Sequence, residues 1–357
     1  MLLPSSRRLT LTIFLLSLTI SLFGLVAVYN ASVVEGYSVF NDKYHFAKQQ
    51  LFWILAGILV FLTLSRFPPL SFKKVALPLF LTALFFLLLV LIPGIGAKVL
   101  GARRWLALGP VRFQPSELMK LSLIVYLSVW LQSKRSLSSF IAIIFLCLGL
   151  IMLQPDLGTA IIIATTSFII YYLSGTSVNK LFAFSGLLGL IVSLLILFSP
   201  YRLQRLKTFL DPTSDPLGSS YHINQILLSL GSGNWFGVGL GRSRQKYAYL
   251  PEATTDSIFA IIAEETGFIG GLFTVALLLA LTLLAFKIAH QQSDSFAKLL
   301  ASGVAVLIMT QTFLNIASMT ALVPLTGVPL PLISYGGSSM LTIFAALGIL
   351  SSVARHQ

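Results

Sequence analysis

The sequence is short of charge, cysteine and histidine, and each shortage excludes a class of protein. Only 10% of its 357 residues are charged, where a soluble domain carries roughly a quarter, so the chain is not a soluble globular protein. The single cysteine, Cys147, allows no intramolecular disulfide, and the four histidines lack ligand spacing to one another, which argues against a histidine-built metal site. Acids are scarcer than bases, 11 against 24, so an acid in an apolar segment is a candidate functional residue.

Long apolar runs dominate the rest of the sequence. Hydrophobic residues make up 56% of it, in continuous runs of about the length that a helix needs to cross a bilayer and not in the short alternating segments of a membrane barrel. We therefore expect an all-α integral membrane protein with about ten transmembrane helices, forming a single polytopic membrane domain over residues 1–357. The predicted spans are 10–30, 49–66, 75–92, 115–132, 138–154, 157–174, 181–199, 256–287, 296–319 and 338–354.

The basic residues in the short loops predict the orientation. An even number of spans places both termini on one side, and cations gather in the loops of that side, which the positive-inside rule makes cytoplasmic. The opposite, external face then holds a loop at 93–114 and a large loop at 201–255, between the seventh and eighth helices. The orienting cations are Arg7, Arg8, Arg66, Lys73, Lys74, Lys134, Arg135, Lys180, Lys287, Lys298 and Arg355.

The two external loops also carry cations, which the orientation rule does not explain. Few acids lie near them, so we expect an anionic partner at this face, and phosphate is the anion that best fits a membrane setting. The alternative is contact with ordinary lipid headgroups. These cations are Lys98, Arg103, Arg104, Arg112, Arg202, Arg205, Lys207, Arg242, Arg244 and Lys246.

Three acids open or enter the eighth span: Asp256, Glu264 and Glu265. Asp256 lies at the aqueous rim, where a carboxylate could exchange protons with water, or it could simply cap the helix, since an acid in a first turn is favoured by the helix dipole. Both roles stay open. Glu264 and Glu265 need partners inside the bundle if they are charged.

Two further polar features lie near the external ends of other spans. Glu117 and Lys120 are three residues apart in an apolar helix, which favours a structural ion pair. Asp156 follows Pro155 at a helix start, which favours capping. The glycine-rich run at 231–241 predicts a tightly folded external loop, but with no strand before it the run does not indicate a nucleotide fold. The proline-rich segment before the last span is expected to line a cavity.

Four stretches resemble one known family across most of the chain. They are GPVRFQPSELMKL with Gly101 to Trp105 before it, QPDLGTA, GSGNWFGVGLGRSRQKYAYLPEATTDSIFAIIAEETG, and PLTGVPLPLISYGGSS. Together they identify the chain as similar to the SEDS family of bacterial cell-wall glycosyltransferases, with a SEDS-type fold. The SRQKYAYLPEA run favours the cell-division branch of that family over the elongation branch. Thr254 and Ser257 depart from the family's usual histidine and phenylalanine around the Thr-Asp pair.

The resemblance implies a function and a set of site residues. The family polymerises lipid II: the 4-hydroxyl of an acceptor GlcNAc attacks the anomeric carbon of a donor MurNAc, and undecaprenyl pyrophosphate leaves with inversion. Asp256 falls on the family's essential acid, and a general base at this rim fits that role physically. External cations would stabilise the leaving diphosphate. The substrate-binding residues that the resemblance implies are Arg103, Arg104, Gln114, Glu117, Lys120, Gln245 and Lys246.

The resemblance also implies partners and a place in the cell. The partners are lipid II and the nascent glycan, a class B penicillin-binding transpeptidase, other divisome proteins and membrane lipids, with no nucleic acid. The place is the cytoplasmic membrane at the division septum. No dedicated cofactor cluster is visible, although a divalent cation (Mg or Mn) could accompany the pyrophosphate. The alternatives are a lipid II flippase, an elongation-type polymerase and a silent scaffold; the nearly uncharged inner halves of the helices count against the flippase.

Overall fold

The computed structural model describes residues 5–99, 101–109, 111–133, 136–176, 186, 189, 197, 199–216, 218–247 and 249–356. Nine helices coincide with nine of the ten predicted spans. The predicted seventh span, 181–199, lies almost entirely outside the described residues. The nine are α1 (Ser5–Phe40), α2 (His45–Leu64), α3 (Pro69–Leu89), α4 (Pro115–Trp130), α5 (Leu137–Met152), α6 (Leu157–Leu173), α10 (Ile258–His290), α11 (Ser295–Met319) and α12 (Gly337–Arg355).

Six of these helices, α1, α2, α3, α10, α11 and α12, are long and apolar enough to cross a membrane, and α5 and α6 are shorter apolar helices. The protein is therefore a multi-pass membrane protein, while the full count of ten spans stays a prediction. Helix α1 runs ten residues past its predicted end, because polar residues such as Asn30 and Glu35 interrupt the apolar run without stopping the helix.

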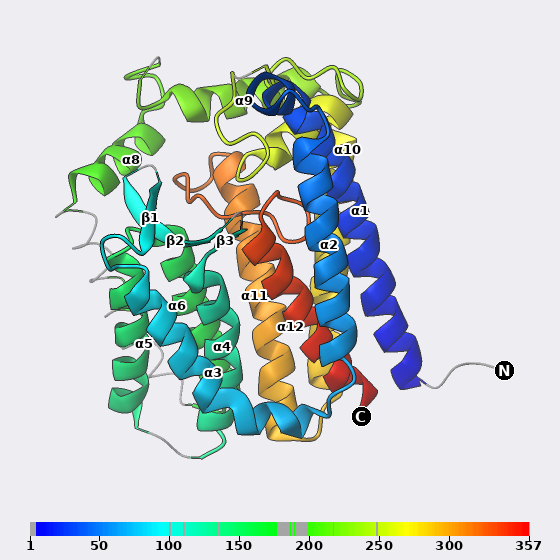
Figure 1. Cartoon of the computed structure of the whole chain (residues 1–357), viewed down its shortest axis with the longest axis vertical. Coiled ribbons are helices and arrows are strands. Elements are labelled where there is room, and N and C mark those ends of the chain that lie inside the picture. Colours follow the sequence, from blue (N-terminus) through cyan, green and yellow to red (C-terminus); the bar gives the residue numbers. More distant parts are fainter. Residues whose placement is uncertain are drawn as a thin grey trace.

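The two ends of the helix bundle differ. Figure 1 shows that α1 begins at the end of the bundle where α12 finishes, whereas α8 (Pro200–Leu210), α9 (Tyr221–Gly233) and a small sheet lie at the opposite end. This arrangement fits the predicted grouping of the loops 93–114 and 201–255. Which end faces the cytoplasm stays a prediction, and three of the orienting cations, Lys134, Arg135 and Lys180, lie outside the described residues.

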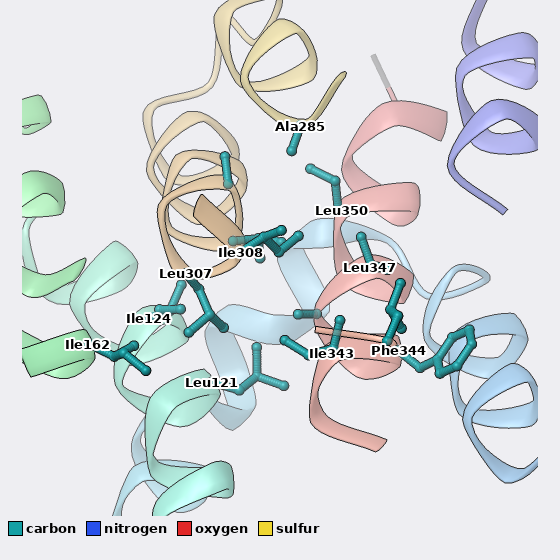
Figure 2. Close-up of a cluster of buried hydrophobic side chains, with 14 of the residues drawn as sticks. Leu121, Ile124, Ile162, Ala285, Leu307, Ile308, Ile343, Phe344, Leu347 and Leu350 are labelled. Atoms are coloured by element: carbon teal, nitrogen blue, oxygen red, sulfur yellow. The ribbon is translucent and has the colours of Figure 1, made fainter. Parts of the chain in front are cut away.

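The core is built around α11 and α12. In their apolar windows 78% of residues are buried, against 22–39% for α1, α2, α3 and α10, whose outer faces are left for lipid. Figure 2 shows how α4, α6, α11 and α12 meet: Leu121, Ile162, Leu307 and Ile343 contribute to one buried apolar cluster. Because lipid is as apolar as these side chains, close packing rather than exclusion from water holds the helices together.

The all-α prediction misses one element, a three-stranded antiparallel sheet in the loop between α3 and α4. Its strands are β1 (Gly96–Val99), β2 (Ala102–Leu108) and β3 (Val111–Phe113), in the order β1-β2-β3. The strands are short, and the turns between them contain Gly101 and Gly109, both with positive φ. Because hydropathy had marked the whole segment only as a break between spans, this local pairing went unpredicted.

Helix α10 is interrupted at Gly267, which has φ 71° and ψ −169°. The glycine-rich loop forms hydrogen bonds with the backbone groups that the interruption leaves without a partner inside the helix. Val238 and Gly239 donate their amides to the carbonyls of Glu264 and Glu265, at 3.0 and 3.1 Å, and the carbonyls of Asn234 and Trp235 accept the amides of residues 268 and 269. The predicted tight fold of this loop therefore comes from its attachment to a helix break.

The attachment allows no side chain at Gly237. A Cβ at this position would lie 2.1 Å from the Glu265 carbonyl oxygen, whereas Gly241, with a similar φ (74° against 79°), has no atom within 4 Å of its Cβ position. Both Gly237→Ala and Gly241→Ala place an alanine at a positive φ, which costs about 1–2 kcal/mol of stability. Only Gly237→Ala also brings a methyl group against the Glu265 carbonyl oxygen. We expect Gly237→Ala to lower the thermal unfolding midpoint of the purified protein clearly more than Gly241→Ala does. Equal shifts would contradict the close contact between Gly237 and the break in α10.

Candidate active site

Asp256 lies in the turn before α10, and its main chain is held from two sides. The Asn315 amide on α11 donates one hydrogen bond to the Asp256 carbonyl at 2.8 Å and another to the Val328 carbonyl at 2.7 Å. The Ser334 hydroxyl donates to the Thr255 carbonyl at 2.6 Å. These bonds fix residue 256 to α11 and to the loop before α12, so the acid is presented from a rigid frame.

The Asp256 side chain does not cap the helix. Helix α10 begins at Ile258, and the residue at its cap position is Ser257, so the interpretation of Asp256 as the N-cap is wrong. The carboxylate is half-buried and lies beside the loop at Gly327, where an added Cβ would be 3.4 Å from Asp256 Oδ2. With no capping role, Asp256 remains the candidate for chemistry.

Burial and neighbouring charges set the proton affinity of Asp256. Burial raises the pKa of Asp256 to about 7, and the carboxylates of Glu252 and Asp156 act in the same direction, while the guanidinium groups of Arg205 and Arg104 oppose the rise. A carboxylate with a pKa near neutrality binds a proton far better than an ordinary aspartate, which is what a general base requires. The four neighbours also show which charged groups surround the candidate base.

Arg104 reaches this site from strand β2. Its Nε donates to the Gln154 carbonyl at 2.9 Å, and its Nη2 donates to the Pro155 carbonyl, so the guanidinium is held against the start of α6. Asp156 caps that helix, as predicted: it accepts from the Thr159 amide at 3.0 Å and from the Thr159 hydroxyl at 2.8 Å. The sheet therefore carries a cation to the start of α6, whose Asp156 acts electrostatically on the candidate base.

Gln114, at the cap position of α4, joins the same group. Its side-chain Nε2 donates to Asp156 Oδ2 at 3.5 Å, and its main-chain amide donates to the Ser338 hydroxyl of α12 at 3.0 Å. Two of the predicted site residues, Arg104 and Gln114, thus converge with Asp256 through Asp156. The starts of α4, α6, α10 and α12 meet at one end of the bundle.

The side chain of Arg103 does not point to the same face of the sheet as that of Arg104. Successive side chains of a strand point to opposite faces, so Arg103 faces away from the side on which Arg104 meets the start of α6. Arg103 is paired across the sheet with Lys98 of β1. The sequence could not separate the two arginines, because the strand that makes them differ was not predicted.

Lys246 and Gln245 lie in the loop that follows the glycine-rich run at 231–241. The Lys246 ammonium donates to the Gly241 carbonyl and forms a buried ion pair with Glu265, 3.6 Å away. Gln245 Oε1 is buried and has no hydrogen-bond partner among the described residues. Glu264 accepts from the Ser243 hydroxyl at 2.5 Å. The two acids of α10 thus have the partners they were expected to need, and those partners fix the loop.

The predicted pair of Glu117 and Lys120 is present and buried, with Lys120 Nζ 2.8 Å from Glu117 Oε1. Lys120 also donates to Gln311 Oε1 at 2.9 Å, and Gln311 donates to the Pro329 carbonyl at 3.0 Å. Gln311 and Asn315 are four residues apart on α11 and so share a face. The ion pair is therefore connected through Gln311 to the loop that supports Asp256, and its role at the site is to position that loop.

Sequence reasoning missed the two amides of α11 and one histidine. Gln311 and Asn315 are polar residues in an apolar span, a signal that could have been used. His222 gave no such signal: it lies on α9, and its Nε2 is 2.9 Å from the hydroxyl of Ser257, the residue after Asp256. Only the fold brings α9 to the start of α10.

The fold and this site define a class of protein: a multi-pass helical membrane protein with a candidate active site at one end of its bundle. Residues 9–357 match the model of the FtsW/RodA/SpoVE family, described as cell cycle proteins, and the chain belongs to this family. The predicted SEDS identity is thereby confirmed.

Similar proteins cover nearly the whole chain. Stage V sporulation protein E of Bacillus subtilis (strain 168) is 38% identical over 355 residues, covering 97% of each chain. The probable peptidoglycan glycosyltransferase FtsW of Trichlorobacter lovleyi is 39% identical over 353 residues, covering 96% of this chain and 92% of its own.

Solved structures show the same fold. A chain from a peptidoglycan synthase complex, studied for its coordination of polymerisation and crosslinking, matches with a TM-score of 0.80 and 28% identity over 96% of this chain and 97% of its own. The rod shape determining protein RodA of Thermus thermophilus matches with a TM-score of 0.71 and 27% identity over 96% of each chain.

Proposed function

We propose that this protein is a peptidoglycan glycosyltransferase that polymerises lipid II at the outer face of the cytoplasmic membrane. The observation that carries the proposal is Asp256: a rigidly held, half-buried acid with a pKa near neutrality, flanked by two arginines at one end of the bundle. Relatives named as peptidoglycan glycosyltransferases support the reaction class. The end of the bundle that carries α8, α9 and the sheet is then external, and both termini are cytoplasmic.

In the proposed reaction Asp256 takes the proton from the 4-hydroxyl of an acceptor GlcNAc. The freed oxygen attacks the anomeric carbon of a donor MurNAc, and the bond from that carbon to undecaprenyl pyrophosphate breaks with inversion. The leaving diphosphate carries the resulting negative charge, which cations already in place stabilise most effectively. Arg104 and Arg205 are the two cations that act on Asp256 itself. Arg103, on the other face of the sheet, and Lys246, tied to Glu265, would bind more distant parts of the substrate.

Gln114, Glu117, Lys120 and Gln245 have different parts in this proposal. Gln114 holds Asp156 beside the base, and Gln245 offers a buried oxygen whose hydrogen-bonding capacity is unused among the described residues. Glu117 and Lys120 position the loop behind Asp256 rather than contact the substrate.

A resident metal does not fit the residues that surround Asp256. Within the described part of the chain, no group of three or more His, Cys, Asp or Glu side chains is placed to hold a metal ion. The proposed reaction therefore uses no protein-bound metal. A divalent cation would instead be bound by the diphosphate of the substrate.

A class B penicillin-binding transpeptidase is the proposed partner, together with other divisome proteins at the septum. The similar chain that belongs to a synthase complex coordinating polymerisation with crosslinking supports such a partner. Several similar relatives are named FtsW, at 36–39% identity, which supports the division branch over the elongation branch.

The test is polymerisation of purified lipid II by the purified protein with its cognate transpeptidase, together with a transbilayer assay in proteoliposomes. Glycan product without lipid II movement supports the proposal. Movement of lipid II without glycan product would favour the flippase, and neither activity with normal partner binding would favour a scaffold.

The pH dependence of polymerisation should report the raised pKa of Asp256. The base works only when it is deprotonated, so below about pH 7 we expect kcat/KM to fall about tenfold per pH unit. Glu252→Gln removes a negative charge that raises this pKa, so the acid limb should move to lower pH. Asp211→Asn, at an exposed acid of the same loop, should leave the limb in place. A limb that Glu252→Gln does not move would contradict the assignment.

A further inference from the structure

A cavity of about 360 Å³ lies between α8, α9 and the loop at Leu325. Its volume is at the small end of the range for ligand pockets, roughly 300–1,000 Å³, which suits one sugar unit better than a polyprenyl lipid. Figure 1 shows α8 and α9 at the end of the bundle where α10 begins, and Asp256 lies two residues before that start. The lining includes Gln204, Arg205, Thr208, Phe209, Ser219 and His222.

Two lining residues connect the cavity with the segments that hold the candidate base. His222 contacts the hydroxyl of Ser257, the residue after Asp256, at 2.9 Å. Arg205 donates to the Leu325 carbonyl at 2.7 Å, which fixes α8 to the loop beside Asp256. Arg205 also acts electrostatically on the Asp256 carboxylate. Asp256 itself does not line the cavity, so a ligand there would lie beside the segment 255–257 and would meet the carboxylate only with the part that extends out of the cavity.

The chemistry of the lining points to a neutral, hydroxyl-rich ligand. An amide, two hydroxyls and an imidazole line it beside the aromatic ring of Phe209, and among the described lining residues Arg205 is the single cation. Burial lowers the pKa of His222, so near pH 7 its imidazole is neutral and can exchange hydrogen bonds with a hydroxyl. A diphosphate would need more cations than this.

We propose that this cavity, the α8–α9 pocket, binds an N-acetylhexosamine unit of the acceptor glycan beside the segment that carries Asp256. The inference rests on the proposed function and adds to it the site of the acceptor sugar. Gln204 and Thr208 bind the sugar by hydrogen bonds, and Phe209 covers the apolar face of the ring. The diphosphate then lies outside the pocket, on the side of Arg104.

The first measurement is direct binding of a soluble probe, the GlcNAc-MurNAc disaccharide without lipid or diphosphate. Saturation-transfer NMR on the full-length protein in nanodiscs should show contact with the wild type. Gln204→Ala and Thr208→Val should weaken that contact strongly. The matched control is Gln225→Ala, because Gln225 lies on α9 and does not belong to the pocket lining. Unchanged contact in both pocket variants would overturn the proposal.

The second measurement is steady-state polymerisation of lipid II. A lost hydrogen bond to the acceptor should raise KM about three- to tenfold in Gln204→Ala and Thr208→Val, with a smaller change in kcat and an unchanged thermal unfolding midpoint. If the wild type polymerises lipid II and both variants keep its KM, the pocket is not the acceptor site, while the proposed function still holds. If the wild type binds the disaccharide but makes no glycan, the pocket is a sugar site, while the proposed function is wrong.

Discussion

Replacing Asp256 with asparagine is expected to lower the rate of lipid II polymerisation by about 10²–10⁴-fold, the usual contribution of a positioned general base. Asparagine has nearly the same shape as aspartate, and the contacts that hold residue 256 use its carbonyl, so the frame built by Asn315 and Ser334 is retained. Only the ability to take a proton is lost. The measurement is the initial rate of glycan formation at about pH 8, where wild-type Asp256 is mostly ionised.

The same substitution should not destabilise the protein, and the sign follows from the pKa. The folded protein holds the Asp256 proton up to a pKa of about 7, against an ordinary value of 3.8. Ionised Asp256 therefore opposes folding above that range, and stability declines as pH rises between the two values. At pH 8 Asp256→Asn should unfold at the wild-type temperature or slightly above it. Wild-type turnover in this variant would reject Asp256 as the base, and a lower unfolding midpoint would show a structural role instead.

The sequence predicted the helices well because bilayer thickness imposes a length on apolar runs. It also predicted the pairing of Glu117 with Lys120 and the capping by Asp156, since both depend on neighbours three residues away in one helix. Asp256 stood out for a similar reason, as an acid at the rim of an apolar span. Local spacing and the cost of burying charge were enough for these features.

The features that the sequence could not supply depend on contacts between distant segments. Arg103 and Arg104 look equivalent in the sequence, and only strand β2 sends them to opposite faces. Lys246 looked like a free external cation, but the break in α10 brings Glu265 to it. His222 meets Ser257 only because α9 packs beside α10. Contacts within one helix were therefore easier to predict than contacts between distant segments.

Removing one partner of the buried Glu117–Lys120 ion pair should destabilise the protein much more than removing both charges together. Lys120→Met leaves Glu117 charged in the core without its counterion, and breaking a buried pair in this way typically costs about 3–5 kcal/mol. Glu117→Leu combined with Lys120→Met removes both charges, so most of the lost stability should return. Lys298→Met, at an exposed lysine near the start of α11, is the matched control and should change stability by less than about 0.5 kcal/mol. Thermal unfolding of the purified variants in one detergent measures all three.

The double variant also separates stability from positioning. Gln311 loses the Lys120 ammonium that fixes its amide, and that amide holds the Pro329 carbonyl in the loop beside Asp256. We therefore expect the double variant to unfold close to the wild-type temperature and yet polymerise lipid II more slowly, with a lower kcat and little change in KM, because Asp256 is less well aimed while the substrate contacts persist. Full activity would show that the pair serves stability alone. A double variant no more stable than Lys120→Met would show that the two charges are not coupled in the way the 2.8 Å contact indicates.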